Sequence, residues 1–102
     1  MVYQVLTVTV APGKNSEVLQ WMKKMADYQK EHFGIEIQIL EPLSGVGGRF
    51  IWVEKEPSFA EWERQDKIFW ADPGAMAILK EAEGLFIGDT QFNFFRDVDF
   101  SA

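Results

Sequence analysis

The sequence predicts one α+β domain, residues 1–102, in which a four-stranded antiparallel sheet carries helices on one face. Four segments are rich in β-branched or aromatic residues and alternate in polarity, and two others repeat apolar residues at helical spacing. They follow one another in the order β-α-β-β-α-β. With 47% hydrophobic and 25% charged residues, the composition is that of one compact domain rather than a disordered chain.

The first elements are a strand and a helix. Residues 2–10 (VYQVLTVTV) alternate and are rich in β-branched side chains, and residues 11–13 (APG) end the strand. From about residue 14 to 32, apolar residues recur at helical spacing, with charged residues on the opposite side. Gly34 stands where such a helix would end, because glycine readily takes the left-handed conformation of a C-terminal cap.

A hairpin is expected next. Residues 35–41 (IEIQILE) alternate as a strand does, and residues 44–48 (SGVGG) supply a turn before a third strand at about 49–55. The glycines of this turn do not form a phosphate loop, because they lead into a strand rather than a helix.

A second helical region and a last strand complete the order. Ser58 and Glu61 have the capping-box spacing, in which the hydroxyl accepts from the third helical amide and the carboxylate reaches back. Residues 72–73 (DP) break this helix and start a short one that is expected to run to Gly84. Residues 90–98 (TQFNFFRDV) read as the fourth strand. This order is the ferredoxin-like, or split βαβ, pattern.

Charge and cysteine content exclude several classes of function. Sixteen acidic groups against ten basic ones give a net charge of -6, so no nucleic acid partner is expected. Without cysteine there is no disulfide, thiolate metal site or thiol nucleophile. The start lacks a basic segment followed by an apolar core, and no run approaches about 18 apolar residues, so we expect no signal peptide, no membrane contact and a cytoplasmic protein.

The sheet face turned away from the helices is expected to be partly apolar, because side chains alternate between the two faces. The side chains expected to point toward the helices are Leu6, Val8, Val10, Ile35, Ile37, Ile39, Ile51 and Val53. The opposite set is Tyr3, Val5, Thr7, Glu36, Gln38, Leu40, Phe50, Trp52, Gln91, Asn93 and Phe95. Exposing its large apolar members would forgo about 1.5 to 3 kcal/mol each, so a second copy of the chain is expected to cover this face about a two-fold axis.

These features resemble a known superfamily. Residues 10–14 (VAPGK) lead into a helix and a hairpin, and residues 69–73 (FWADP) precede a short helix and an aromatic strand. Over nearly the whole chain this resembles the dimeric α+β barrel superfamily, above all its NIPSNAP-like and antibiotic-monooxygenase-like branches. The resemblance implies a homodimer whose two sheets form a barrel, often with a small-molecule pocket between the sheet and the helices of each subunit. Members include cofactor-free oxygenases, haem-degrading enzymes, small isomerases and proteins without an assigned activity.

One activity of that superfamily is not carried over. The haem-degrading members rely on an Asn, a Trp and a His, and the second helix here offers Trp62 and Trp70 but no histidine. The only histidine, His32, lies near the end of the first helix, where a cation is favourable, and forms no familiar metal-ligand spacing. No metal and no cofactor are therefore expected.

Asp66 is the candidate catalytic residue. On a helix it lies four residues from both Trp62 and Trp70, hence on or beside the apolar stripe. Desolvation there would raise its pKa and make it a general base. The alternative is that Asp66 sits at the edge of the stripe and pairs with solvent or a nearby lysine.

The candidate ligand-binding residues come from the strands and the second helix. Trp52 and Trp70 would form stacking walls for a planar ligand, and Tyr3, Gln38 and Asn93 would be the polar groups that orient it. Alternatively, the tryptophans belong to the core, and the polar groups bond one another or water across the dimer.

The expected function is therefore to bind or convert a small hydrophobic molecule in a pocket between sheet and helices. The resemblance suggests cofactor-independent oxygenation or an isomerisation as the reaction. The competing expectation is a non-catalytic homodimeric module whose barrel is packed solid by Phe50, Trp52 and Phe95.

Overall fold

A computed structural model describes residues 1–45 and 47–101 of the chain. In it a four-stranded sheet carries three helices on one face. The strands lie in the order β2-β3-β1-β4, and every neighbouring pair is antiparallel, which confirms the predicted ferredoxin-like order. The elements are β1 (Val2–Val10), α1 (Asn15–Phe33), β2 (Ile37–Leu40), β3 (Arg49–Glu56), α2 (Phe59–Trp70), α3 (Pro73–Lys80) and β4 (Phe86–Arg96).

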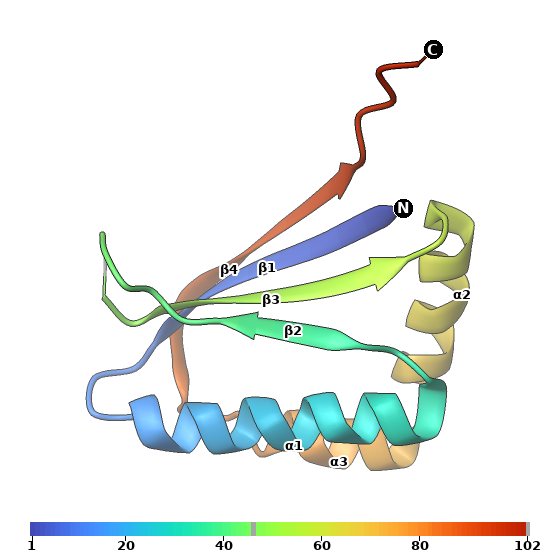
Figure 1. Cartoon of the computed structure of the whole chain (residues 1–102). Coiled ribbons are helices and arrows are strands. Elements are labelled where there is room, and N and C mark those ends of the chain that lie inside the picture. The colour runs from blue at the N-terminus through green and yellow to red at the C-terminus, as the bar shows by residue number, and fades with distance from the viewer. Residues whose placement is uncertain (46, 102) are drawn as a thin grey trace.

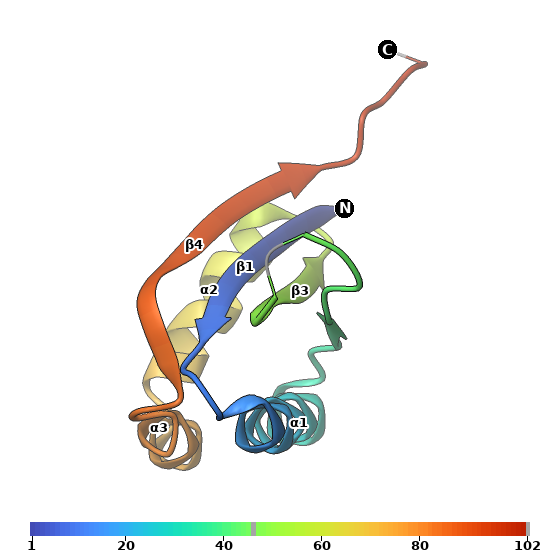
Figure 2. The same ribbon diagram turned by 90° about the vertical axis from the view of Figure 1, so that its left-hand side faces the viewer.

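The helices leave one face of the sheet bare. Helices α1 and α3 run side by side beneath the sheet, and α2 crosses one end of it (Figure 1). Seen after a quarter turn, the three helices lie on the same side of the curved sheet (Figure 2). The chain after β4 projects away from the body (Figure 1). We call the face turned away from the helices the open face.

The predicted caps at Gly34 and Ser58 are confirmed, whereas the predicted end of α3 is not. Gly34 ends α1 in the left-handed conformation with φ of 68°, and its N–H donates to the carbonyl oxygens of Gln29 and Lys30. The Ser58 hydroxyl accepts from the backbone N–H of Glu61, as the capping box requires. The other half of the box is not formed, because the Glu61 carboxylate binds Arg64 instead. Helix α3 ends at Lys80 rather than Gly84, since turns follow it.

The last strand begins earlier than predicted. Phe86 and Ile87 already pair with Val10 and Thr9 of β1, whereas the sequence placed the start of the strand at Thr90. The pairing register shifts between Thr7 and Thr9, so β4 bulges at this point. Gly88 lies in the bulge with φ of 69°, a conformation that glycine adopts at little cost. The bulge lets β4 bend over the helices, and the bend is visible in Figure 2.

The face assigned to the third strand was wrong. Phe50 pairs with Val8 and Trp52 pairs with Leu6, so all four side chains share the helix side of the sheet. Phe50 is only 4% exposed and Trp52 7%. Ile51 and Val53, which were predicted to point toward the helices, lie on the open face instead, opposite Thr7 and Val5.

The core lies between the helix side of the sheet and α1. Val18, Met22 and Met25 of α1 are almost fully buried against Val8, Phe50 and Trp52. The described residues form no helix that is both long and apolar enough to span a bilayer.

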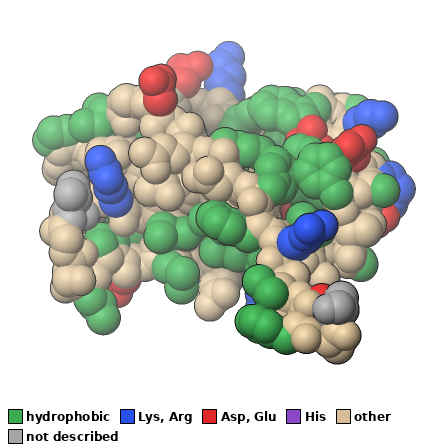
Figure 3. Space-filling view, turned by 90° about the horizontal axis from the view of Figure 1, so that it is seen from above, with side chains coloured by type: hydrophobic (Ala, Val, Ile, Leu, Met, Phe, Trp, Pro, Cys, Tyr) green, Lys and Arg blue, Asp and Glu red, His purple; other side chains and the backbone are tan. Residues whose placement is uncertain are grey.

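The open face mixes apolar and polar side chains without an element to cover it. Hydrophobic side chains gather in several groups on the molecular surface turned away from α1 and α3 (Figure 3). Leu40 and Phe95 are exposed, and Val5, Ile51 and Val53 are half-buried. The strand register places on this face Tyr3, Val5, Thr7, Gln38, Leu40, Ile51, Val53, Gln91, Asn93 and Phe95.

Candidate functional site

A cavity of about 420 Å³ lies between the helix side of the sheet and the helices. Its walls come from β1, β3 and β4 on one side and from α1, α2 and the end of α3 on the other. Trp70, which is 57% exposed, and Phe92 also line it, so the cavity opens to solvent beside them. The lining residues are Gln4, Leu6, Val8, Trp21, Met22, Met25, Gln29, Ile35, Trp52, Glu54, Trp62, Gln65, Asp66, Phe69, Trp70, Leu79, Ala82, Phe86, Thr90 and Phe92.

All four tryptophans of the chain line this cavity. Trp21 is fixed by a 2.7 Å hydrogen bond from its Nε1 to the carbonyl oxygen of Ile78. Trp62 packs edge-on against Phe94, with ring centroids 4.6 Å apart. Trp52 is held in the core by its place in the sheet. The predicted pair, Trp52 and Trp70, therefore lies in one cavity together with Trp21 and Trp62.

Asp66 lies at the wall of the cavity, half-buried on α2. Its Oδ1 accepts a 3.1 Å hydrogen bond from Nε1 of Trp70, one helical turn further on. Trp70 is therefore the partner of Asp66, whereas the alternative interpretation named solvent or a lysine. The indole fixes the direction of the carboxylate through one of its two oxygens, Oδ1. Its catalytic role stays a prediction.

Sequence reasoning missed a second carboxyl group in the cavity, that of Glu54 on β3. Glu54 is 7% exposed and lies opposite Gln4, another lining residue. Burial raises the pKa of Glu54 to about 8, and a hydrogen bond with Glu56 and the charges of Glu56 and Asp66 add to the rise. The signal that could have found it is the alternation of Phe50, Trp52 and Glu54, which puts the carboxyl on the same face as two buried rings.

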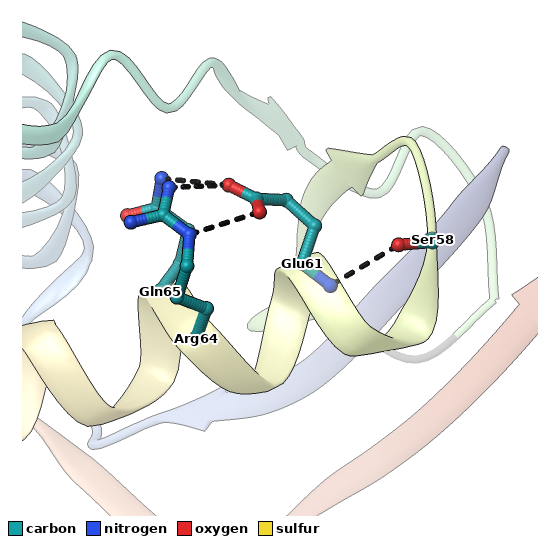
Figure 4. Close-up of polar contacts among 4 residues, drawn as sticks. All are labelled: Ser58, Glu61, Arg64 and Gln65. Carbon is teal, nitrogen blue, oxygen red and sulfur yellow. Dashed lines mark hydrogen bonds and ion pairs between the residues drawn. The ribbon is translucent and has the colours of Figure 1, made fainter.

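Three glutamines add uncharged polar groups to the lining. Gln4, Gln29 and Gln65 are all buried. The Gln65 amide donates from Nε2 to Oε1 of Glu61 at 3.3 Å, and this oxygen also accepts from Nη2 of Arg64 (Figure 4). The Oε1 atom of Gln65 is buried without a hydrogen-bond partner. A buried acceptor without a donor is costly, so this oxygen is a natural contact for a bound ligand.

The other predicted ligand-binding residues lie elsewhere. Tyr3, Gln38 and Asn93 are on the open face and do not line the cavity. The Tyr3 hydroxyl donates to Oδ1 of Asp97 at 2.8 Å, and Gln38 and Asn93 are exposed. Neighbouring residues of a strand point to opposite faces of the sheet, so Gln4 lines the cavity and Tyr3 does not.

The single histidine is outside the cavity. His32 stacks on Tyr28 with ring centroids 3.9 Å apart, and its Nδ1 lies 3.0 Å from the Tyr28 carbonyl oxygen. Across the residues that the structure describes, no three His, Cys, Asp or Glu side chains come together as a metal site would need.

Known structures share this fold across nearly the whole chain. A NIPSNAP family protein of unknown function from Agrobacterium tumefaciens matches with a TM-score of 0.83 and 17% identity, over 98% of this chain and 90% of that one. An uncharacterised NIPSNAP domain protein from Burkholderia xenovorans gives 0.77 and 18%, over 98% and 97%. A candidate antibiotic biosynthesis monooxygenase from Deinococcus radiodurans gives 0.72 and 17%, over 97% and 94%.

These neighbours confirm, at the level of the fold, the resemblance that the sequence suggested. No protein-family profile matches the chain, and no curated protein matches its sequence.

Proposed function

We propose that the protein binds a small, flat, apolar molecule in the cavity between the sheet and the helices. The observation that carries the proposal is that all four tryptophans of the chain line one cavity of about 420 Å³, a volume suited to a ligand of two or three rings. Tryptophan provides a large apolar surface and a flat face for stacking. A few buried polar groups among apolar walls are the usual composition of a small-molecule site.

A neutral fluorescent probe tests this directly. N-phenyl-1-naphthylamine is expected to bind in the micromolar range, at about 10⁻⁶ M, and to quench tryptophan fluorescence because every indole of the chain lines the cavity. Trp70→Ala should weaken binding by about tenfold, the value of one lost aromatic contact. Leu43→Ala, which removes an apolar side chain that is 96% exposed in a loop, is the matched control and should bind as the wild type does. Equal binding by both variants would place the probe elsewhere.

The reaction proposed for this site is proton abstraction by Asp66, without a cofactor. Removal of this proton would be the first step of either an isomerisation or a cofactor-independent oxygenation of the bound molecule. Its support is geometric: the carboxylate lies at the cavity wall, half-buried, and is oriented by the Trp70 indole. Buried glutamine amides in the same lining could donate hydrogen bonds to an oxyanion.

Deuterium exchange measures this step without knowledge of the natural substrate. In D2O the wild type is expected to catalyse exchange at the carbon next to the carbonyl of 2-tetralone, since Asp66 would take the proton and return a deuteron. Asp66→Asn should reduce the catalysed rate by about a hundredfold or more. Glu63→Gln, on the exposed side of α2, is the control for the change in charge. Exchange that proceeds equally in Asp66→Asn, or that the wild type does not accelerate, would remove Asp66 from the role of base.

We further propose that two copies pack with their open faces together. The support is the half-buried and exposed apolar side chains of that face, among them Leu40, Val53 and Phe95, which none of the described elements covers. The competing module with a barrel packed by Phe50 and Trp52 is not favoured, because both rings lie on the helix side of the sheet.

A further inference from the structure

Three polar side chains line the cavity where β3 faces α2. They are Glu54 of β3 and Gln65 and Asp66 of α2, and we call these three residues the polar end. The Gln65 side chain is only 9% exposed, and its Oε1 has no donor. The Glu54 carboxyl is equally buried, and Asp66 acts on it electrostatically. A ligand that brings a donor to Oε1 of Gln65 would remove the cost of this unpaired buried acceptor.

The charge around the polar end is negative. Not one of the cavity-lining residues that the structure describes is Lys, Arg or His. Glu54 is faced by Glu56 from its own strand and by Asp66 from α2, and Gln4 opposite it on β1 is neutral. Glu56 in turn is acted on by Glu61 and by Arg64, but Arg64 is held by Glu61 through two hydrogen bonds. An anionic ligand would therefore be repelled, and a cationic one attracted.

The aromatic walls of the cavity also favour a cationic ligand. The faces of indole rings carry negative electrostatic potential, and tryptophan is the strongest cation–π partner among the side chains. Trp52, Trp62 and Trp70 line the cavity together with the polar end. Aromatic faces combined with carboxylates are the chemistry that recognises ammonium groups.

We propose that the cavity takes a protonated amine carried on a flat apolar body, with the ammonium group at the polar end and the body among the tryptophans. This inference rests on the proposed function and specifies the class of its ligand. The ammonium group supplies up to three donors, enough for Glu54, for Oε1 of Gln65 and for Asp66. A neutral alcohol supplies one donor and no charge.

Binding of such a cation is coupled to proton release. Because burial raises the pKa of Glu54 to about 8, this carboxyl carries its proton at neutral pH in the free protein. A bound cation stabilises the carboxylate and lowers its pKa, so the proton leaves on binding. The affinity for a cation therefore increases as the pH rises toward about 8 and levels off above it. The affinity for a neutral ligand has no such dependence.

Three matched probes test the inference by calorimetry: 2-(1-naphthyl)ethylammonium, 2-(1-naphthyl)ethanol and 1-naphthylacetate. At about pH 8 the ammonium probe is expected to bind about tenfold or more tightly than the alcohol, and the carboxylate most weakly. Between about pH 6 and about pH 8 the affinity for the ammonium probe should rise about tenfold, while the amine itself stays protonated as an alkylammonium does. Glu54→Gln should remove this rise and most of the preference for the ammonium probe over the alcohol.

The control variant is Glu36→Gln, which makes the same substitution at an exposed position just before β2. It should keep the preference for the ammonium probe and its pH dependence. The pH profile of the wild type tests the inference even if Glu54→Gln folds poorly. Tightest binding of the alcohol or the carboxylate, or an ammonium affinity that does not change with pH, overturns the amine inference while the proposed cavity stands. Failure of all three probes to bind contradicts the proposed function itself.

Discussion

Val53→Lys is expected to prevent the proposed dimer from forming. Val53 lies on β3 in the open face, with Val5 of β1 on one side and Gln38 of β2 on the other. If two open faces pack about a two-fold axis, each copy would bury one lysine without a partner, and a buried unpaired charge is strongly unfavourable. The dimer dissociation constant should rise by about a hundredfold or more, equivalent to about 2.7 kcal/mol.

Light scattering coupled to size-exclusion chromatography gives the mass of each variant. Leu43→Lys is the control, because it makes a comparable change in a loop side chain that is almost fully exposed. The wild type and Leu43→Lys should elute as dimers, and Val53→Lys as a folded monomer with an unchanged circular dichroism spectrum. A wild type that is monomeric in dilute solution would contradict the proposed dimer, and a dimeric Val53→Lys would place the interface elsewhere.

The sequence was sufficient for elements whose pattern has one interpretation. Helix α2 has one apolar stripe, so the spacing of Trp62, Asp66 and Trp70 was enough to place the carboxylate beside aromatic rings. Gly34 and Ser58 act as caps because their chemistry is local and depends on a few neighbouring backbone groups. Such signals do not require knowledge of what packs against the element.

The third strand had two equivalent interpretations. Phe50 and Trp52 alternate with Ile51 and Val53, so both faces of β3 are apolar and hydrophobic pattern alone does not choose between them. The choice is made by pairing with β1, where Val8 meets Phe50. That error concealed Glu54, which shares the parity of Phe50, and so the most perturbed carboxyl of the cavity was absent from the predicted site. The same ambiguity is itself a sign that both faces of this sheet need covering.

The corrected assignment of the β3 side chains to the two faces predicts different effects on stability for substitutions in the core and in the proposed interface. Phe50 is 4% exposed and packs in the main core, but it does not line the cavity. Phe50→Ala should therefore lower the free energy of unfolding by about 3 to 5 kcal/mol through lost burial and the void that remains. This is a large part of the total stability of a small domain, about 5 to 15 kcal/mol. The variant should be partly unfolded at moderate temperature.

Ile51→Ala is the matched comparison, because Ile51 is the next residue of β3 and lies on the open face. Urea denaturation of both variants should be run at several protein concentrations, since the stability of a dimer depends on concentration. Phe50→Ala should lower the midpoint at every concentration, because its defect lies inside each subunit. Ile51→Ala should lower it mainly by weakening association, so that its effect decreases when subunits are already dissociated by dilution. The opposite pattern would indicate that Phe50 lies on the open face. Trp52 and Glu54 would then also lie outside the cavity, because the three residues share one side of the strand.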